Sequence, residues 1–201
     1  MKRTTLTIAS FLLSISASVA SAEHQYITFD ENENMVVSGP FEAVIPKPAN
    51  ARIGGPENSS PSFMNEDLKV SKAGYFGDVE MVIVNVETTN AAAGTLSNEN
   101  LPVYEIAGEE FRARKACIDI SQAELDMDDD PFFEFIEDQN VQVVPAVQAV
   151  QLSVVTDDGT GEGTILYLRN VPDGCDSVSP EFMTEFEGAF ATFIETIRGT
   201  D

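Results

Sequence analysis

Five acidic residues near the middle of the chain have the spacing of a calcium loop. They lie in "DMDDDPFFEFIE", residues 126–137, at the first, third, fifth, ninth and twelfth positions of a twelve-residue segment. The five are Asp126, Asp128, Asp130, Glu134 and Glu137. Carboxylate oxygens at these positions are the ligands that such loops offer to Ca²⁺. The segment is therefore the first candidate for metal chemistry in this sequence.

The segment departs from a calcium loop at its most restrictive position. An EF-hand loop turns sharply at its sixth residue, normally glycine, whereas here that residue is Pro131, whose ring fixes φ near about −65°. The entering helix is also short, because residues 121–124 have the capping-box pattern that begins a helix. We interpret residues 126–137 as the acidic start of a helix with Asp130 as its N-cap, and expect short helices near 121–139. Loose binding of Ca²⁺ or another hard cation by this run of carboxylates stays an alternative.

Histidine-based catalysis is excluded by composition. His24 is the only histidine and lies second in the expected mature chain, so neither a Ser-His-Asp device nor a histidine zinc site is available. Paired carboxylates could run a hydrolase, but with 34 acidic residues and no Trp for sugar stacking no particular pair stands out. The sequence names no catalytic residue, and a carboxylate-based hydrolase remains an alternative function.

Two short motifs resemble anion-binding sites only in composition. The cluster "RARK" contributes Arg112, Arg114 and Lys115, which we expect to balance nearby acids such as Glu109 and Glu110. The glycines of "GTGEG", residues 159–163, lie between two expected strands with no helix after them. A phosphate-binding loop needs a helix N-terminus at that point, so we interpret this segment as part of a hairpin turn.

The first 22 residues have the features of a secretory signal. Lys2 and Arg3 precede an apolar stretch, and Ala20-Ser21-Ala22 is a small-residue cleavage site. The stretch is too short to cross a bilayer core of about 30 Å, and no later run approaches the roughly 20 apolar residues required. We therefore expect the mature chain to begin near residue 23, not to be embedded in a membrane, and to work in the periplasm or outside a bacterial cell.

The charge and the two cysteines indicate the surroundings of the mature chain. The formal net charge is −23, which repels nucleic acid and favours cations and basic partners. Cys117 and Cys175 are the only cysteines, and in an exported chain they are predicted to form a disulfide. A redox or metal pair is disfavoured because the C-x-x-C spacing is absent.

The apolar pattern predicts a mainly antiparallel sheet. Strand-like pieces occur in 24–30 and 35–45, whereas the four prolines and two glycines of 46–62 predict an irregular loop. Residues 79–89 have the strongest strand pattern and are expected to form a central strand. Residues 103–120 favour two strands with a turn at Gly108, with a helix as the alternative. Residues 141–171 predict a hairpin in which Pro145 marks an edge or a bend.

The chain closes with the pattern of an amphipathic helix. Ser179 is a suitable N-cap, Pro180 fits the first helical position, and Gly199 is a suitable stop. One face collects apolar residues at helical spacing: Phe182, Phe186, Ala189, Phe190, Phe193, Ile194 and Ile197. We expect this face to pack on the sheet, with a groove-binding or self-association face as the alternative.

These patterns predict an α+β protein with a mostly antiparallel sheet packed by a C-terminal amphipathic helix. The expected organisation is a signal at 1–22, a β-rich arm and Pro/Gly-rich loop at 23–62, and an α+β body at 63–201. The leading functional hypothesis is an exported acidic binding or accessory domain with a protein or small-molecule partner. No cofactor is expected, apart from the Ca²⁺ alternative.

Overall fold

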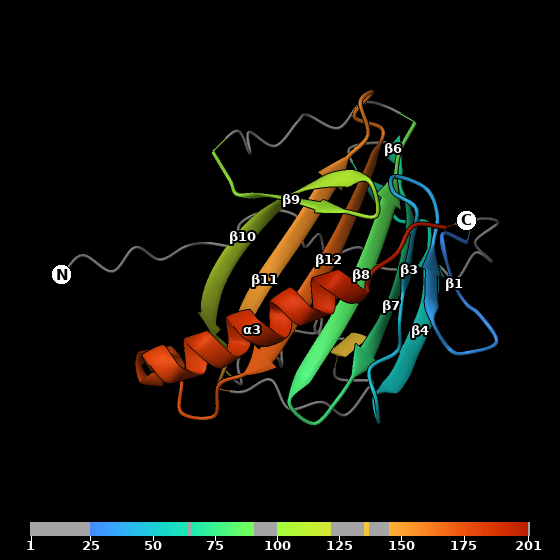
Figure 1. The fold of residues 1–201 in the computed structure, drawn as a ribbon. Helices are drawn as coiled ribbons and strands as arrows, with labels where there is room; N and C mark the ends of the chain where they lie inside the picture. Colours follow the sequence, from blue (N-terminus) through green and yellow to red (C-terminus); the bar gives the residue numbers. More distant parts are fainter. Residues whose placement is uncertain (1–24, 64–65, 91–99, 122–134, 137–144, 201) are drawn as a thin grey trace.

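The computed structural model describes residues 25–63, 66–90, 100–121, 135–136 and 145–200 (Figure 1). The expected signal lies outside these ranges. So do all five candidate calcium ligands: Asp126, Asp128, Asp130, Glu134 and Glu137. Of the short helices expected near 121–139, only Phe135 and Ile136 are described after Ser121, and both are helical.

The largest element is a seven-stranded antiparallel sheet. Its spatial order is β4-β7-β8-β12-β11-β10-β9, and every pair of neighbours is antiparallel. The strands in this order are β4 (Arg52–Ser59), β7 (Lys69–Phe76), β8 (Glu80–Thr88), β12 (Gly161–Asn170), β11 (Ala146–Val155), β10 (Glu109–Asp119) and β9 (Val103–Ile106). The expected central strand is β8, which has a partner on each side, and the expected hairpin is β11–β12, preceded by a bend at Pro145.

Two smaller sheets accompany the large one. An antiparallel sheet near the N-terminal end of the described chain contains β1 (Ile27–Phe29), β2 (Met35–Val37) and β3 (Ala43–Ile45). A short ladder pairs β5 (Ser62–Phe63) with β6 (Glu66–Asp67).

The C-terminal helix forms as its capping pattern predicts. A 3₁₀ turn, η1 (Cys175–Ser177), leads into α3 (Pro180–Thr196). The Ser179 hydroxyl accepts a hydrogen bond from the backbone N–H of Phe182 at 3.1 Å, which satisfies one of the free donors of the first turn. The helix ends at Thr196, a little before Gly199.

One face of the large sheet, here called the helix face, carries the main core. α3 lies across this face in Figure 1, and the three-stranded sheet covers the rest of it. The helix contributes Phe186, Phe190 and Phe193, all buried, which confirms the predicted packing of its apolar face. The two covering elements are joined, because the backbones of Val44 in β3 and Arg198 after α3 exchange hydrogen bonds of 2.7 and 3.1 Å. The fold is thus broadly α+β, and sheet predominates among the described residues.

The opposite face, here called the back face, is divided into two parts. One part is a smaller apolar cluster in which Phe76, Met81 and Leu168 pack with Phe135 and Ile136. The other part is a strip of polar side chains, here called the polar strip, on β8, β12 and β11. Its members are Asn85, Glu87, Gln151, Ser153, Glu162 and Thr164, placed on one face by the strand registers.

Two expectations are corrected by the structure. Residues 46–62 were predicted to be irregular, but Arg52–Ser59 form β4. The strand tolerates Pro56 because it lies at the edge of the sheet, where the register shifts between Gly54 and Glu57 and only one side needs ladder donors. The helical alternative for 103–120 is also wrong, because Ala107 and Gly108 both have positive φ, as a two-residue hairpin turn requires.

The predicted disulfide is present. Cys117 of β10 and Cys175 of η1 are bonded, with their Cα atoms 5.7 Å apart. The bond attaches the connection between β12 and α3 to a strand on the other side of β11. Such a bond indicates an oxidising compartment.

A close contact between two glycines and the N-terminal segment fixes the three-stranded sheet on the helix face. A Cβ atom on Gly163 would lie 2.3 Å from Cδ1 of Phe41, and one on Gly161 would lie 2.8 Å from Pro40. Phe41 is buried and meets Phe111 edge to face, with ring centroids 5.1 Å apart. The Phe41 ring therefore cannot move away from an added Cβ atom at Gly163 without disturbing its packing on Phe111.

We predict that Gly163→Ala destabilises the fold by about 1–3 kcal/mol, the usual cost of overpacking a filled core. Gly188→Ala is the matched control, because a Cβ atom there meets nothing within 4 Å and the residue lies in the interior of α3. That change should stabilise the fold by roughly 0.5–1 kcal/mol through helix propensity. Urea unfolding measures both, and equal effects of the two substitutions would contradict the proposed contact.

Replacing both cysteines by serine should lower the free energy of unfolding by roughly 4 kcal/mol. The estimate follows from the loop-closure entropy of a cross-link between residues separated by 58 positions. Chemical unfolding of the two proteins measures the difference, and intact mass after alkylation counts the thiols. An alkylated thiol in the unreduced wild type would show that the bond does not form in solution.

Candidate functional site

The described residues contain a pocket of about 560 Å³ on the helix face, at the seam between α3 and the segment that leaves the three-stranded sheet. We call it the seam pocket. Its volume lies within the roughly 300–1,000 Å³ that ligand sites usually occupy. It is open to solvent on one side and is bounded by segments that are far apart in the sequence.

Three groups of residues enclose the seam pocket. The floor is the large sheet, which contributes Tyr75, Val82 and Tyr167. One wall is the C-terminal half of α3, and the other is the loop after β3 together with the β7–β8 turn. These walls comprise Ala189, Thr192, Phe193 and Thr196 on the helix, residues 46–51 in the loop, and Gly77, Asp78, Val79 and Glu80 in and after the turn.

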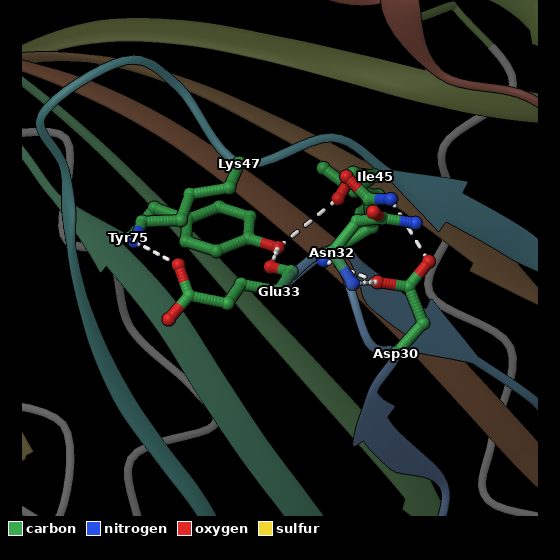
Figure 2. A network of polar contacts seen from close by, with 7 residues as sticks. Asp30, Asn32, Glu33, Ile45, Lys47 and Tyr75 are labelled. Atoms are coloured by element: carbon green, nitrogen blue, oxygen red, sulfur yellow. Dashed lines mark hydrogen bonds and ion pairs between the residues drawn. The ribbon is translucent and has the colours of Figure 1, made fainter.

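The Tyr75 side chain anchors the β1–β2 turn and the end of β3 to the sheet. Figure 2 shows its hydroxyl directed at two backbone carbonyls, those of Glu33 at 2.8 Å and Ile45 at 3.1 Å. Burial raises the pKa of this hydroxyl, and the charges of Asp30 and Glu33 add to the shift. The side chain of Glu33 accepts a hydrogen bond from the ammonium group of Lys47, a residue of the loop after β3 that lines the pocket.

The β1–β2 turn is held in shape by one carboxylate. Asp30 Oδ1 accepts from the backbone N–H groups of Asn32 and Asn34, both at 2.8 Å, and Oδ2 accepts from the Asn34 side chain at 2.8 Å (Figure 2). Hydrogen bonds to the charged form lower the pKa of Asp30, with the Asn34 side chain as the largest cause. The turn therefore presents the Glu33 carbonyl to Tyr75 in a fixed position.

Tyr167 joins the pocket floor to α3. Its ring stacks on Phe193 with centroids 5.2 Å apart and contacts Phe186 and Phe190, each with centroids at 5.6 Å. Its hydroxyl is buried beside the Glu80 carboxylate, but it makes no hydrogen bond of ordinary geometry with that group or with another described residue. Burial raises the pKa of this hydroxyl, and the neighbouring carboxylate of Glu80 adds to the shift.

The charged groups at the pocket are unevenly partnered. Arg169 donates to Glu80, with Nε at 3.2 Å from Oε1, and lies 3.9 Å from the carboxylate of Glu185 on α3. Asp78 is exposed and forms no ion pair with any described residue. Beside it, Val79 is 57% exposed, unusually high for a large apolar side chain. The pocket thus has an apolar lip next to a free carboxylate.

The motifs singled out in the sequence do not build this pocket. "RARK" is divided by strand alternation, which puts Lys115 on the helix face and Arg112 and Arg114 on the back face. Lys115 binds Glu187 of α3 at 3.1 Å rather than Glu109 or Glu110. Gly161 and Gly163 of "GTGEG" belong to β12, where their small size admits Pro40 and Phe41.

A carboxylate-based hydrolase would combine a pocket with a close pair of carboxyl groups, one of them with a raised pKa. In this fold the pocket and such a pair lie on opposite faces of the sheet. Glu87 and Glu162 are directly opposed across β8 and β12, and burial followed by the charge of Glu87 raises the pKa of Glu162. This pair belongs to the polar strip on the back face, whereas the seam pocket is on the helix face. The carboxylates in the pocket, Asp78 and Glu80, come from one short segment, and Glu80 is bound to Arg169.

The described residues contain no group of three or more His, Cys, Asp or Glu side chains placed to hold a metal ion. None of the helices in these ranges has the length and apolar character needed to span a membrane.

Comparison with protein-family models, with curated proteins and with solved structures gives no match. The residues of the site therefore have to be interpreted from their own geometry.

The two pocket-floor tyrosines should respond differently to loss of the hydroxyl. Tyr75→Phe removes a donor that serves two carbonyls and should cost about 1 kcal/mol in the free energy of unfolding. Tyr167→Phe removes a buried hydroxyl that lies beside the Glu80 carboxylate without a well-aligned hydrogen bond, so its cost should be smaller. Thermal or urea unfolding of the two variants tests this, and a loss for Tyr167→Phe as large as for Tyr75→Phe would show that its hydroxyl is hydrogen-bonded in solution.

Proposed function

We propose that this chain is an exported binding domain whose seam pocket takes an apolar side chain from a basic segment of a partner protein. The observation that carries the proposal is the pocket itself, with the exposed side chain of Val79 at its lip and the unpaired carboxylate of Asp78 beside it. A cavity of this size that is open to solvent and has an apolar floor is a typical binding site.

Charge determines the kind of partner. The formal net charge of the chain is −23, and at the pocket Asp78 has no ion-pair partner among the described residues, whereas Glu80 is paired with Arg169. The lysine at the pocket, Lys47, is paired with Glu33, so it does not offset the charge of Asp78. A partner segment that carries Lys or Arg next to its apolar residue would complement this lip and associate faster at low salt.

Binding is favoured over hydrolysis by the composition of the pocket. A hydrolase of the carboxylate type places two carboxyl groups on opposite sides of the scissile bond. Asp78 and Glu80 lie on one side of the seam pocket, and Glu80 is held by Arg169. A role for the acidic run at 126–137 as a cation site remains a separate proposal, outside the described residues.

The disulfide supports work in an oxidising compartment, and we infer that this is the periplasm or the medium, reached through the signal at residues 1–22.

Titration with a short peptide tests the proposal. The probe is the acetylated and amidated tripeptide Lys-Leu-Lys, followed by amide NMR shifts of the ¹⁵N-labelled protein. We expect saturable shifts at Gly77–Glu80 and along the C-terminal half of α3, with weaker binding at high salt because the charges are exposed. The peptides Lys-Ser-Lys and Glu-Leu-Glu, which lack the apolar group or reverse the charge, should bind much more weakly.

A pair of surface variants provides the control. Val79→Ser should reduce the affinity for Lys-Leu-Lys, whereas Val103→Ser, at the other large apolar side chain that is exposed among the described residues, should leave it unchanged. Shifts spread evenly over the acidic surface, or equal loss in both variants, would show non-specific charge attraction and would reject the pocket as the site.

A further inference from the structure

The polar strip on the back face brings two carboxyl groups together, and neither has an ion-pair partner among the described residues. Glu87 of β8 and Glu162 of β12 are direct partners in the antiparallel register, and both side chains are only partly exposed. Directly opposed residues have Cβ atoms about 4.5–5.5 Å apart, close enough for their carboxyl groups to touch. Like charges in that position destabilise the pairing of the two strands.

The other charged groups that face this pair are engaged elsewhere or lie farther away. On the back face of β7, Lys72 is diagonal to Glu87, but its ammonium group lies over the Phe135 ring, 5.7 Å from the centroid. β11, on the other side of β12, presents only uncharged residues to the pair, and the nearest arginine beyond it is Arg112, which is opposite Ser153. None of the ion pairs among the described residues includes Glu87 or Glu162.

The neighbouring polar groups give the two carboxyl groups different surroundings. The Asn85 amide donates to Glu87 Oε1 at 2.7 Å. Beside Glu162, the hydroxyls of Thr164 and Ser153 are buried and lie 3.4 Å apart. Burial and the charge of Glu87 raise the pKa of Glu162, and a hydrogen bond with the Thr164 side chain opposes this shift. A proton held between the two carboxyl groups would turn their repulsion into a hydrogen bond.

We propose that Glu87 and Glu162 form a carboxyl pair that shares a proton, and that this pair makes the pairing of β8 with β12 more stable as the medium becomes acidic. β8 and β12 are the two neighbouring strands at which the β4-β7-β8 part of the large sheet meets the β12-β11-β10-β9 part. Protonation therefore acts at the junction between the two halves of the sheet. The pair would stabilise the fold in acid, and it includes no residue of the seam pocket.

The sign of the effect follows from linkage. The pKa of Glu162 in the folded protein is raised from its ordinary 4.5, so the folded state binds the proton more readily than the unfolded chain does. Above the folded pKa both groups are charged and repel each other, which destabilises the fold. As the pH falls through the folded pKa, the proton enters and this loss is recovered.

The chain contains a matched control for the experiment. Glu105 and Glu110 are also opposed across an antiparallel pair of strands on the back face, but both are exposed at the edge of the sheet. Water screens charges in that setting, so their repulsion should be weak. Glu162→Gln and Glu110→Gln therefore remove the same charge from the same kind of cross-strand pair, and they differ in burial.

We expect Glu162→Gln to raise Tm at about pH 7 and this advantage over the wild type to shrink towards about pH 4, as the wild-type pair takes up its proton. Glu110→Gln should differ little from the wild type across the same range. Side-chain carboxyl ¹³C NMR should give Glu162 a midpoint above 4.5, and Glu87→Gln should lower that midpoint. The NMR titration of the wild-type protein tests the proposal even if a variant does not fold.

A Glu162 midpoint at or below 4.5 would overturn the proposal, because the pair would then stay charged in mild acid. So would a Glu162 midpoint that Glu87→Gln leaves unchanged, since burial alone would then explain the shift. Equal pH dependence of the Tm of Glu162→Gln and Glu110→Gln would assign the effect to the overall charge of the chain.

Discussion

The contact of the Tyr167 ring with Phe186, Phe190 and Phe193 is the interaction on which the other layers depend. An antiparallel sheet with one apolar face has to cover that face, and here a helix and a three-stranded sheet divide the task. Because the aromatic cluster fixes where α3 lies, it also fixes where the helix stops covering the sheet. The seam pocket occupies the place where neither covering element fills the space completely.

The elements that the sequence predicts well are those whose signal is local. Ser179 and Pro180 mark the start of α3 because capping depends on neighbours in the chain. The β-branched run of residues 79–89 marks β8 because residues 81–84 within it are buried on both faces of the sheet. The edge strand β4 was missed because Pro56 and its glycines are unfavourable in most strands. A strand can contain these residues when it lies at the edge of a sheet. Which strand lies at the edge depends on the arrangement of the whole sheet and not on the local sequence.

The candidate site could not be predicted in the same way. Its floor, walls and lip come from Tyr75, Val79, Tyr167 and Phe193 and from the loop after β3, and no spacing in the sequence connects them. The same limit applies to Glu87 and Glu162, whose opposition depends on the register between strands far apart in the chain. In contrast, the conspicuous motifs "RARK" and "GTGEG" are explained by strand alternation and by packing under Phe41. Neither of these two motifs lines the seam pocket.

The pairing of Val44 with Arg198 has a consequence for the order of folding. β3 pairs with β2 on one side, and the segment after α3 supplies its neighbour on the other side. The Thr200 hydroxyl adds a hydrogen bond to Glu42, 158 positions earlier. Contacts of such long sequence separation form late, because closing the intervening chain costs entropy before any contact is gained. Hairpins such as β9–β10 and β11–β12 can assemble while the chain is still emerging from a ribosome or a translocon. The N-terminal sheet, although made first, acquires its last neighbour only when the C-terminal segment arrives, so the earliest part of the chain is among the last to be completed.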